Sequence, residues 1–356
     1  MRARTAVVIT AVLTALIVFG AFSALYRYTP AKTTTVTEMI YSTKTIYATT
    51  TTYVTSTITI TQTTSAGMGI TLSNYTLLVP NGTAPAMAES TSSQWPSSMM
   101  AAAYVGDGYV MLTPYPWNSK EWSGKIDVSY NGSAAFAFVD EAYRQKYNPS
   151  APVLGYPSLR YGCDPLFSAC TAVAPILPLP MPVNEVGHVY SVLDYELHKG
   201  TCNITDFSYD IWINHGSGLT AGDYEVMLWL YYAESPASSS WYTDLGGGYL
   251  TLLINGSLVQ EHVEVYAHFY ANPWSLIIVT LDKPIANGSV GVDLGQLFSL
   301  VNSLISKQGH SLNGLQLTSI DIGLEYDGTP NANLTCSYVV NKWALAYAKN
   351  KYNETS

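Results

Sequence analysis

The feature that most constrains the fold is a series of short alternating runs that begins after about residue 100. In each run apolar and polar side chains alternate, as in a β-strand with one face in the core. The runs are separated by Gly, Asn, Pro and Asp, which favour turns. They read YVMLTPYPW, GKIDVSY, SAAFAFV, HVYSVLDYEL, DFSYDIWIN, YEVMLWLYY, YLTLLING, VEVYAHFY, WSLIIVTL, SVGVDL, SIDIGLEYDG and LTCSYVVNKWALAY.

One segment, residues 294–308, has helical spacing instead. Its apolar face carries Leu297, Leu300, Val301, Leu304 and Ile305. A dozen strands and one helix predict an all-β fold for residues 101–350. The expected architecture is two packed antiparallel sheets, a β-sandwich of the jelly-roll type.

The N-terminal 30 residues have the pattern of a membrane anchor or a signal peptide. Arg2 and Arg4 precede an uncharged run over residues 6–25, about long enough to cross a bilayer as a helix. The two arginines place the N-terminus in the cytoplasm and the rest of the chain outside. We favour an uncleaved anchor on length, while cleavage near Ser23 remains the alternative.

Residues 31–100 are predicted to be a Thr/Ser-rich linker or stalk. Half of the residues from 33 to 64 are Thr, a composition typical of O-glycosylated stalks. An additional strand is the alternative, because Thr, Val and Ile favour β structure. The remaining residues up to 100 continue the linker or form a poorly patterned first strand.

The cysteines and sequons indicate an extracellular protein. We predict the disulfides Cys163–Cys170, which closes a short loop, and Cys202–Cys336, which joins two predicted strands. The eight Asn-x-Ser/Thr sequons lie at Asn74, Asn81, Asn131, Asn203, Asn255, Asn287, Asn333 and Asn353. We expect a monomer that is secreted or anchored to the outer face of the membrane.

Charge and histidine spacing exclude other classes of function. Charged residues make up 12% of the chain and the net charge is −9, so no nucleic-acid partner is expected. The six His residues show no metal-binding or catalytic-triad spacing, and we expect neither a metal nor another cofactor.

Three carboxyls in predicted strands are the candidate catalytic groups. Glu225 lies in YEVMLWLYY, Asp210 in DFSYDIWIN and Glu325 in SIDIGLEYDG. A carboxyl in a strand usually faces solvent. Three such acids beside Trp or Met instead favour one shared face. Retaining glycoside hydrolysis needs two carboxyls about 5–5.5 Å apart, and neighbouring strands can hold that separation.

The chain resembles glycoside hydrolase family 12, the jelly-roll endo-β-1,4-glucanases, particularly its thermophilic and archaeal members. The resemblance covers about residues 104–347. The matching pieces, in order, are WNSKEWSG, PVLGYPSLRYG, LPLPMPV, SYDIWI, GDYEVMLWLYY, NPWSLIIVTLDKP, SVGVDLGQLF and DIGLEYDG. Each motif is short, but their order and spacing are specific.

The resemblance implies a role for each candidate residue. Glu225 matches the nucleophile, Glu325 the acid/base, and Asp210 an acid that hydrogen-bonds the nucleophile. The implied substrate-binding residues are Trp117 as an aromatic platform, Met227 beside the nucleophile, and Tyr266 and Trp274 along the cleft. The implied partner is a β-glucan: cellulose, mixed-linkage glucan or xyloglucan.

Two positions depart from the family pattern. Leu166 stands where a Trp is expected, inside the predicted Cys163–Cys170 loop, and Tyr115 replaces an Asn. These changes affect the expected subsites and leave the two glutamates unaltered. The competing hypotheses are a non-catalytic glycan-binding sandwich and a structural cell-surface protein, neither of which needs both glutamates.

Overall fold

The computed structural model describes residues 70–80, 82–94, 101–106, 108–166, 169–216 and 218–350. Its strands are β1 Ile70–Val79, β2 Ala86–Thr91, β3 Ala103–Val105, β4 Val110–Tyr115, β5 Ser119–Tyr130, β6 Ala135–Lys146, β7 Tyr156–Gly162, β8 Met181–Pro182, β9 Val189–Lys199, β10 Asn203–Asn214, β11 Tyr224–Tyr232, β12 Thr243–Ile254, β13 Ser257–His268, β14 Ser275–Leu281, β15 Asn287–Asp293, β16 Gln316–Asp327 and β17 Leu334–Asn350. The helical segments are η1 Ser92–Gln94, η3 Val183–Glu185, η4 Pro236–Ser238, α2 Leu294–Ile305 and η5 Ser306–Gln308.

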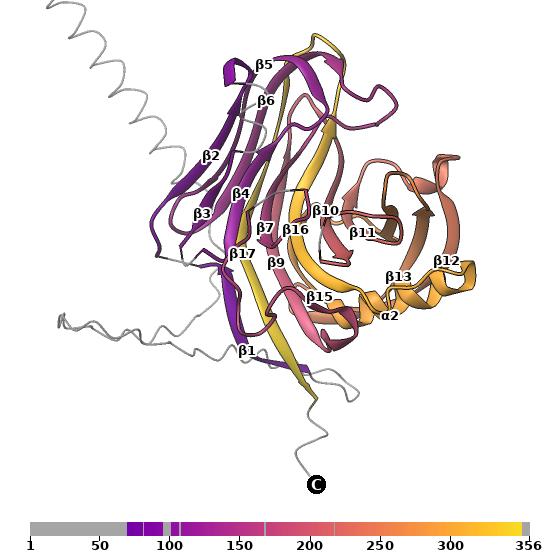
Figure 1. Cartoon of the computed structure of the whole chain (residues 1–356). Helices are drawn as coiled ribbons and strands as arrows, with labels where there is room; N and C mark the ends of the chain where they lie inside the picture. Colours follow the sequence, from indigo (N-terminus) through magenta and orange to yellow (C-terminus); the bar gives the residue numbers. More distant parts are fainter. Residues whose placement is uncertain are drawn as a thin grey trace, which may run out of the picture. The chain divides into compact units, whose positions relative to one another are not determined.

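The strands form a continuous hydrogen-bonded path that folds over itself into two layers (Figure 1). The path runs β2–β5–β6–β17–β9–β15–β12–β13–β14–β11–β10–β16–β7–β4–β3. The Phe207 ring of β10 packs between Tyr195 of β9 and Tyr338 of β17, with ring centroids 4.6 Å and 5.3 Å away. The core therefore lies between the layers, and the predicted all-β jelly-roll sandwich is confirmed.

Two details differ from the sequence prediction. Strands β1 and β2 lie within residues 31–100, where we favoured a linker over a poorly patterned first strand, so the folded domain begins by residue 70. The alternation of apolar and polar residues in β1 and β2 is weak. Their hydrogen bonds to β17 and β5, which the local sequence does not reveal, hold them in the sheet. The pairing of β11 with β14 is parallel, whereas we predicted antiparallel sheets.

The predicted anchor or signal helix at residues 1–30 and the Thr-rich segment at 33–64 lie outside the described residues. Within the part of the chain that the structure describes, no helix has the length and apolar character to span a membrane.

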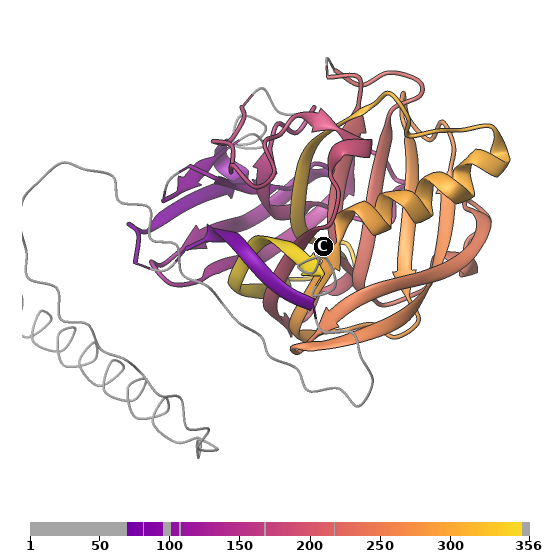
Figure 2. The same ribbon diagram turned by 90° about the horizontal axis from the view of Figure 1, so that it is seen from below.

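The predicted helix is present as α2, continued by η5 (Figure 2). The Asp293 carboxylate caps its N-terminus by accepting a hydrogen bond from the Gln296 amide at 3.0 Å. Leu297, Val301 and Leu304 of the predicted apolar face are buried against the core.

Both predicted disulfides, Cys163–Cys170 and Cys202–Cys336, are present. The second joins the residue before β10 to β17 across 134 residues of sequence.

Candidate active site

The candidate site is built on β10, which pairs with β11 on one side and with β16 on the other. Alternation along β10 directs Phe207, Tyr209 and Ile211 into the core. The intervening residues point to the opposite side, which we name the acid face. It carries five carboxyls: Asp206 and Asp210 from β10, Glu225 from β11, and Asp321 and Glu325 from β16.

The predicted glutamates share this face, but their strands are not adjacent. Strand β10 separates them, with Trp212 opposite Glu225 and Asp206 opposite Glu325. Electrostatic interaction nevertheless links the two glutamates, since the charge of Glu225 raises the pKa of Glu325. The expectation that neighbouring strands hold the pair is therefore wrong in detail, because a third acid-bearing strand lies between them.

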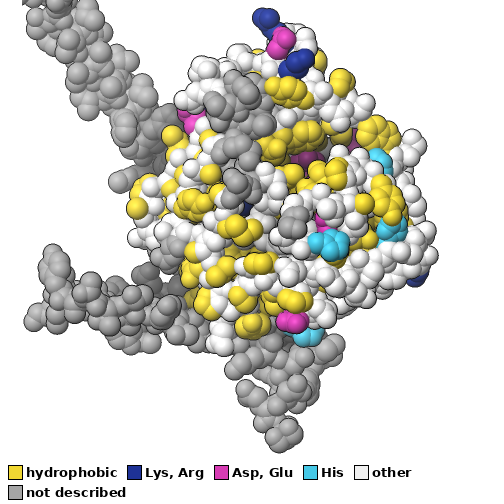
Figure 3. Space-filling view, viewed as in Figure 1, with side chains coloured by type: hydrophobic (Ala, Val, Ile, Leu, Met, Phe, Trp, Pro, Cys, Tyr) yellow, Lys and Arg dark blue, Asp and Glu magenta, His cyan; other side chains and the backbone are white. Residues whose placement is uncertain are grey.

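Exposure divides the five carboxyls into two groups. Asp206 and Asp321 are 0% exposed and Asp210 is 7% exposed, whereas Glu225 and Glu325 are only partly buried. Figure 3 shows acidic side chains recessed among hydrophobic ones on one side of the molecule. The three aspartates thus lie beneath the surface, and the two glutamates can reach a bound molecule.

Arg160 of β7 is the cation that faces these acids among the described residues. Its Nη1 lies 2.8 Å from Asp321 Oδ2 and forms a second ion pair with Asp164, while its Nε donates to Thr113 Oγ1 at 2.8 Å. Arg160 therefore compensates Asp321 directly, and its charge also lowers the pKa of Glu225 and Asp210. Within the described part of the chain, no ion pair joins Asp206 or either glutamate to a cation.

Glu225 is held by the indole of Trp274, which lies just before β14. Trp274 Nε1 donates to Glu225 Oε2 at 2.6 Å, and the Trp274 ring packs edge-on against Trp212. Burial raises the pKa of Glu225 to about 7, and the charges of Asp321 and Asp206 add to this, while the Trp274 hydrogen bond opposes it. Trp274 thus stabilises the anionic form of Glu225.

Glu325 retains its proton more strongly. Burial, followed by the charge and the hydrogen bond of Asp206, raises the pKa of Glu325 well above its ordinary value. This ordering leaves Glu225 as the better candidate for the anion and Glu325 as the better candidate for the acid.

Asp210 lies beside Glu225 on the neighbouring strand, opposite Met227 and Asp321. Burial, and then the charge of Glu225, raises the pKa of Asp210 well above its ordinary value. Its Oδ1 has no hydrogen-bond partner in the described chain. The donor that contacts Glu225 is Trp274, and the supporting role of Asp210 remains a prediction.

The acid face continues into an apolar wall on β11, β14 and β13. Met227, Trp229, Tyr266 and Ile278 form one cluster, and Tyr242 packs against it from the segment before β12. Met227 is 4% exposed and Tyr266 is 5% exposed, so each offers a sugar only a small surface. Trp229 is also buried here, at 5% exposed, and packs within the same cluster.

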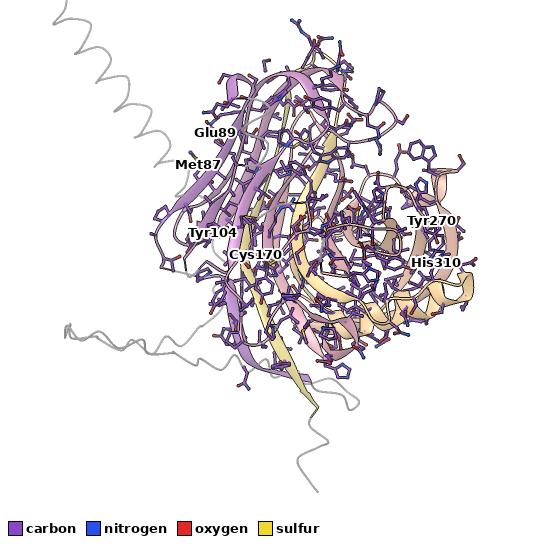
Figure 4. All side chains as sticks on the ribbon, viewed as in Figure 1. Met87, Glu89, Tyr104, Cys170, Tyr270 and His310 are labelled. Carbon is purple, nitrogen blue, oxygen red and sulfur yellow. A yellow bond between two sulfur atoms is a disulfide. The ribbon has the colours of Figure 1, made fainter. Side chains whose placement is uncertain are left out.

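Trp117 lies in the turn between β4 and β5, half-buried. Backbone hydrogen bonds from Asn118 to Leu154 and from Leu154 to Tyr326 dock this turn beside the end of β16 that carries Glu325. Trp274 lies at the other end of the face, in the turn that also holds the exposed Tyr270. Figure 4 shows Tyr270 and His310 on that side of the molecule.

Four contributors to the site were missed by sequence reasoning: Asp206, Asp321, Arg160 and Tyr242. Asp206 and Asp321 each lie four residues before a recognised acid, so strand alternation alone places them on the same face. Arg160 and Tyr242 come from separate segments, and no local pattern connects them to the site. The described residues contain no cluster of His, Cys, Asp and Glu that could hold a metal ion.

A jelly roll with paired glutamates beside an aromatic wall has the features of a glycoside hydrolase. The sequence profile of glycosyl hydrolase family 12 matches residues 108–346. The chain therefore belongs to glycoside hydrolase family 12 and is a hydrolase of β-glucans. Comparison with curated protein sequences gives no match.

Solved structures of family 12 enzymes are among those that match this chain. A metagenome-derived family 12 endoglucanase is 15% identical with a TM-score of 0.50, over 75% of this chain and 99% of that one. A family 12 xyloglucanase from Bacillus licheniformis is 16% identical with a TM-score of 0.49, over 74% of this chain and 99% of that one. Endoglucanase 3 from Trichoderma harzianum is 19% identical with a TM-score of 0.48, over 74% and 98%.

Proposed function

We propose that this chain is a retaining endo-β-1,4-glucanase that acts through a covalent glycosyl-enzyme intermediate. The observation that carries the proposal is that two partly exposed glutamates lie on one face with different partners, Trp274 for Glu225 and Asp206 for Glu325. Glu225 ionises first because Trp274 supports its anion, and Glu325 holds its proton beside Asp206.

In the first step the Glu225 carboxylate attacks the anomeric carbon while Glu325 donates its proton to the departing glycosidic oxygen. In the second step Glu325 takes a proton from water, and the resulting hydroxide displaces Glu225 from the sugar. Two inversions at the anomeric carbon give net retention.

The substrate is proposed to be cellulose, mixed-linkage glucan or xyloglucan, bound along the acid face between Trp117 and Trp274. The two disulfides, the sequons and the N-terminal apolar run support export, with the enzyme secreted or anchored outside the cell.

The test is reducing-sugar release from a panel of soluble β-glucans, with proton NMR of the first product. We expect release from at least one glucan and an initial β-anomer. An initial α-anomer would show an inverting enzyme. A folded protein with no release from any glucan would contradict the proposed activity.

A further inference from the structure

Asp206 is the carboxyl that faces the proposed general acid most directly. It lies opposite Glu325 in the β10–β16 register, and both side chains point to the acid face. The β10 and β16 backbones therefore fix the two carboxyls against each other.

The Asp206 side chain is completely buried and has few partners. Ser208 Oγ donates to Asp206 Oδ1 at 2.8 Å, and the Asp206 carboxyl is hydrogen-bonded to that of Glu325. Asp206 Oδ2 receives no N–H or hydroxyl donor from the described part of the chain. Since two carboxylates repel, a hydrogen bond between two carboxyls requires a proton on one of them.

No ion pair between Asp206 and a cation is found among the residues that the structure describes. The ion pairs of Arg160 are with Asp321 and Asp164. The other titratable groups that face the pair are acids or phenols: Asp210 from β10, Glu225 from β11, Tyr156 from β7 and Tyr242 from the segment before β12. A proton shared with Glu325 therefore reduces the cost of burying the Asp206 carboxyl, because the pair then carries one negative charge instead of two.

We propose that Asp206 is a positioning residue for the general acid, which shares one proton with Glu325 and holds the Glu325 carboxyl in its working orientation. The proposal rests on the role of Glu325 in the proposed function. When Glu325 gives its proton to the glycosidic oxygen, two facing carboxylates remain. Their repulsion makes Glu325 a stronger base for the water proton that it must take in the second step.

The experiment is a carbon-13 NMR titration of the side-chain carboxyls in wild type and Asp206→Asn, with the Glu325 signal assigned by its loss in Glu325→Gln. Removing the facing charge should lower the Glu325 midpoint by about one pH unit or more. The matched control is Asp321→Asn, an equally buried aspartate on the same face that pairs with Arg160 instead. It should move the Glu325 midpoint by less than half as much. An unchanged midpoint in folded Asp206→Asn, or equal shifts in both variants, would overturn the proposal.

A reciprocal measurement covers the case in which Asp206→Asn does not fold. In Glu325→Leu, which removes the carboxyl that donates to Asp206 and keeps a side chain of similar size, the Asp206 midpoint should rise above about 7, because that hydrogen bond lowers the pKa of Asp206. An unmoved Asp206 midpoint would contradict the shared proton.

Kinetics provide a further readout that a purely structural role would not change. The alkaline limb of kcat/KM against pH should be displaced in Asp206→Asn, and superimposed profiles would count against the proposal. The titrations do not depend on turnover. Wild type that fails to cleave any glucan but shows the coupled titration would refute the proposed function and leave the carboxyl pair intact.

Discussion

The two faces of β10 and β11 are similarly buried and chemically opposite. On the core face, Ile211 and Leu228 are 0% exposed and are surrounded by apolar side chains. On the acid face of the same strands, Asp206 is also 0% exposed and Asp210 is 7% exposed. Burial alone therefore does not distinguish a side chain that stabilises the fold from one that serves the site. The distinction lies in the neighbours of each side chain.

The comparison also explains how the domain tolerates a buried acid cluster. The core face gains free energy from apolar burial. On the acid face Asp206, Asp210 and Asp321 keep raised pKa values, and Asp321 pairs with Arg160. Protonation therefore limits the negative charge on the buried aspartates, and this reduces the free-energy cost of burying them.

The largest expected effect is on turnover, from Glu225→Gln. The amide cannot attack the anomeric carbon, so kcat should fall at least about 10⁴-fold, equivalent to about 5.5 kcal/mol in the barrier. Thermal stability should be nearly unchanged, because the amide oxygen of the substituted side chain can still accept the hydrogen bond from Trp274 while one carboxyl of the acid face is removed. The measurements are glucan hydrolysis and calorimetric Tm of the purified variant. Near-normal turnover in a sequence-verified sample would exclude Glu225 as the nucleophile.

Leu228→Ala on the same strand should show the opposite effect. Removing buried methyl groups from the core face should lower the free energy of unfolding by about 2–5 kcal/mol. Turnover at a temperature where the variant is folded should remain within a few-fold of wild type, since the side chain points away from the acid face. Urea unfolding and initial rates check this prediction. A stable Leu228→Ala with greatly reduced turnover would show that the two faces are coupled.

The local sequence pattern predicted the strands and the helix better than it predicted the contacts between strands. Alternation around Glu225 and Asp210 was sufficient to predict both strands and their two faces, and the spacing of Leu297 and Val301 predicted α2. The pairing of Asp206 with Glu325 depends on register between strands more than 100 residues apart, which no local pattern contains. The same is true of the parallel β11–β14 pairing and of Arg160, which reaches Asp321 from a third strand.

The pH dependence of stability should report on the acid face. Folding raises the pKa of Asp206, Asp321 and Glu225 to about 7, and it raises those of Asp210 and Glu325 well above their ordinary values. The native state then binds more protons than the unfolded state above about pH 4, so stability must fall as pH rises from 4 through 7.

We expect Tm to decrease by at least about 5 °C over this interval. The slope should be shallower in Asp210→Asn, because the amide cannot titrate. The control is Asp244→Asn at an exposed aspartate, which should leave the slope unchanged. A Tm that rises steadily from pH 4 to pH 7 would show that the buried aspartates are ionised in the native state.

The smallest expected effect concerns the indole that distinguishes Glu225 from the other acids. Trp274→Phe keeps an aromatic ring but removes the Nε1 donor 2.6 Å from Glu225. Since that hydrogen bond lowers the pKa of Glu225, its loss should raise this pKa. The acidic limb of kcat/KM should move to higher pH by about 0.5–1 unit, with a smaller loss of maximal rate than in Glu225→Gln.

The matched control for Trp274→Phe is Trp229→Phe on β11, where the buried Nε1 has no hydrogen-bond partner in the described chain. The control should leave the limb in place, and an equal displacement in both variants would mean that packing of the aromatic wall, and not the hydrogen bond, sets the ionisation of Glu225.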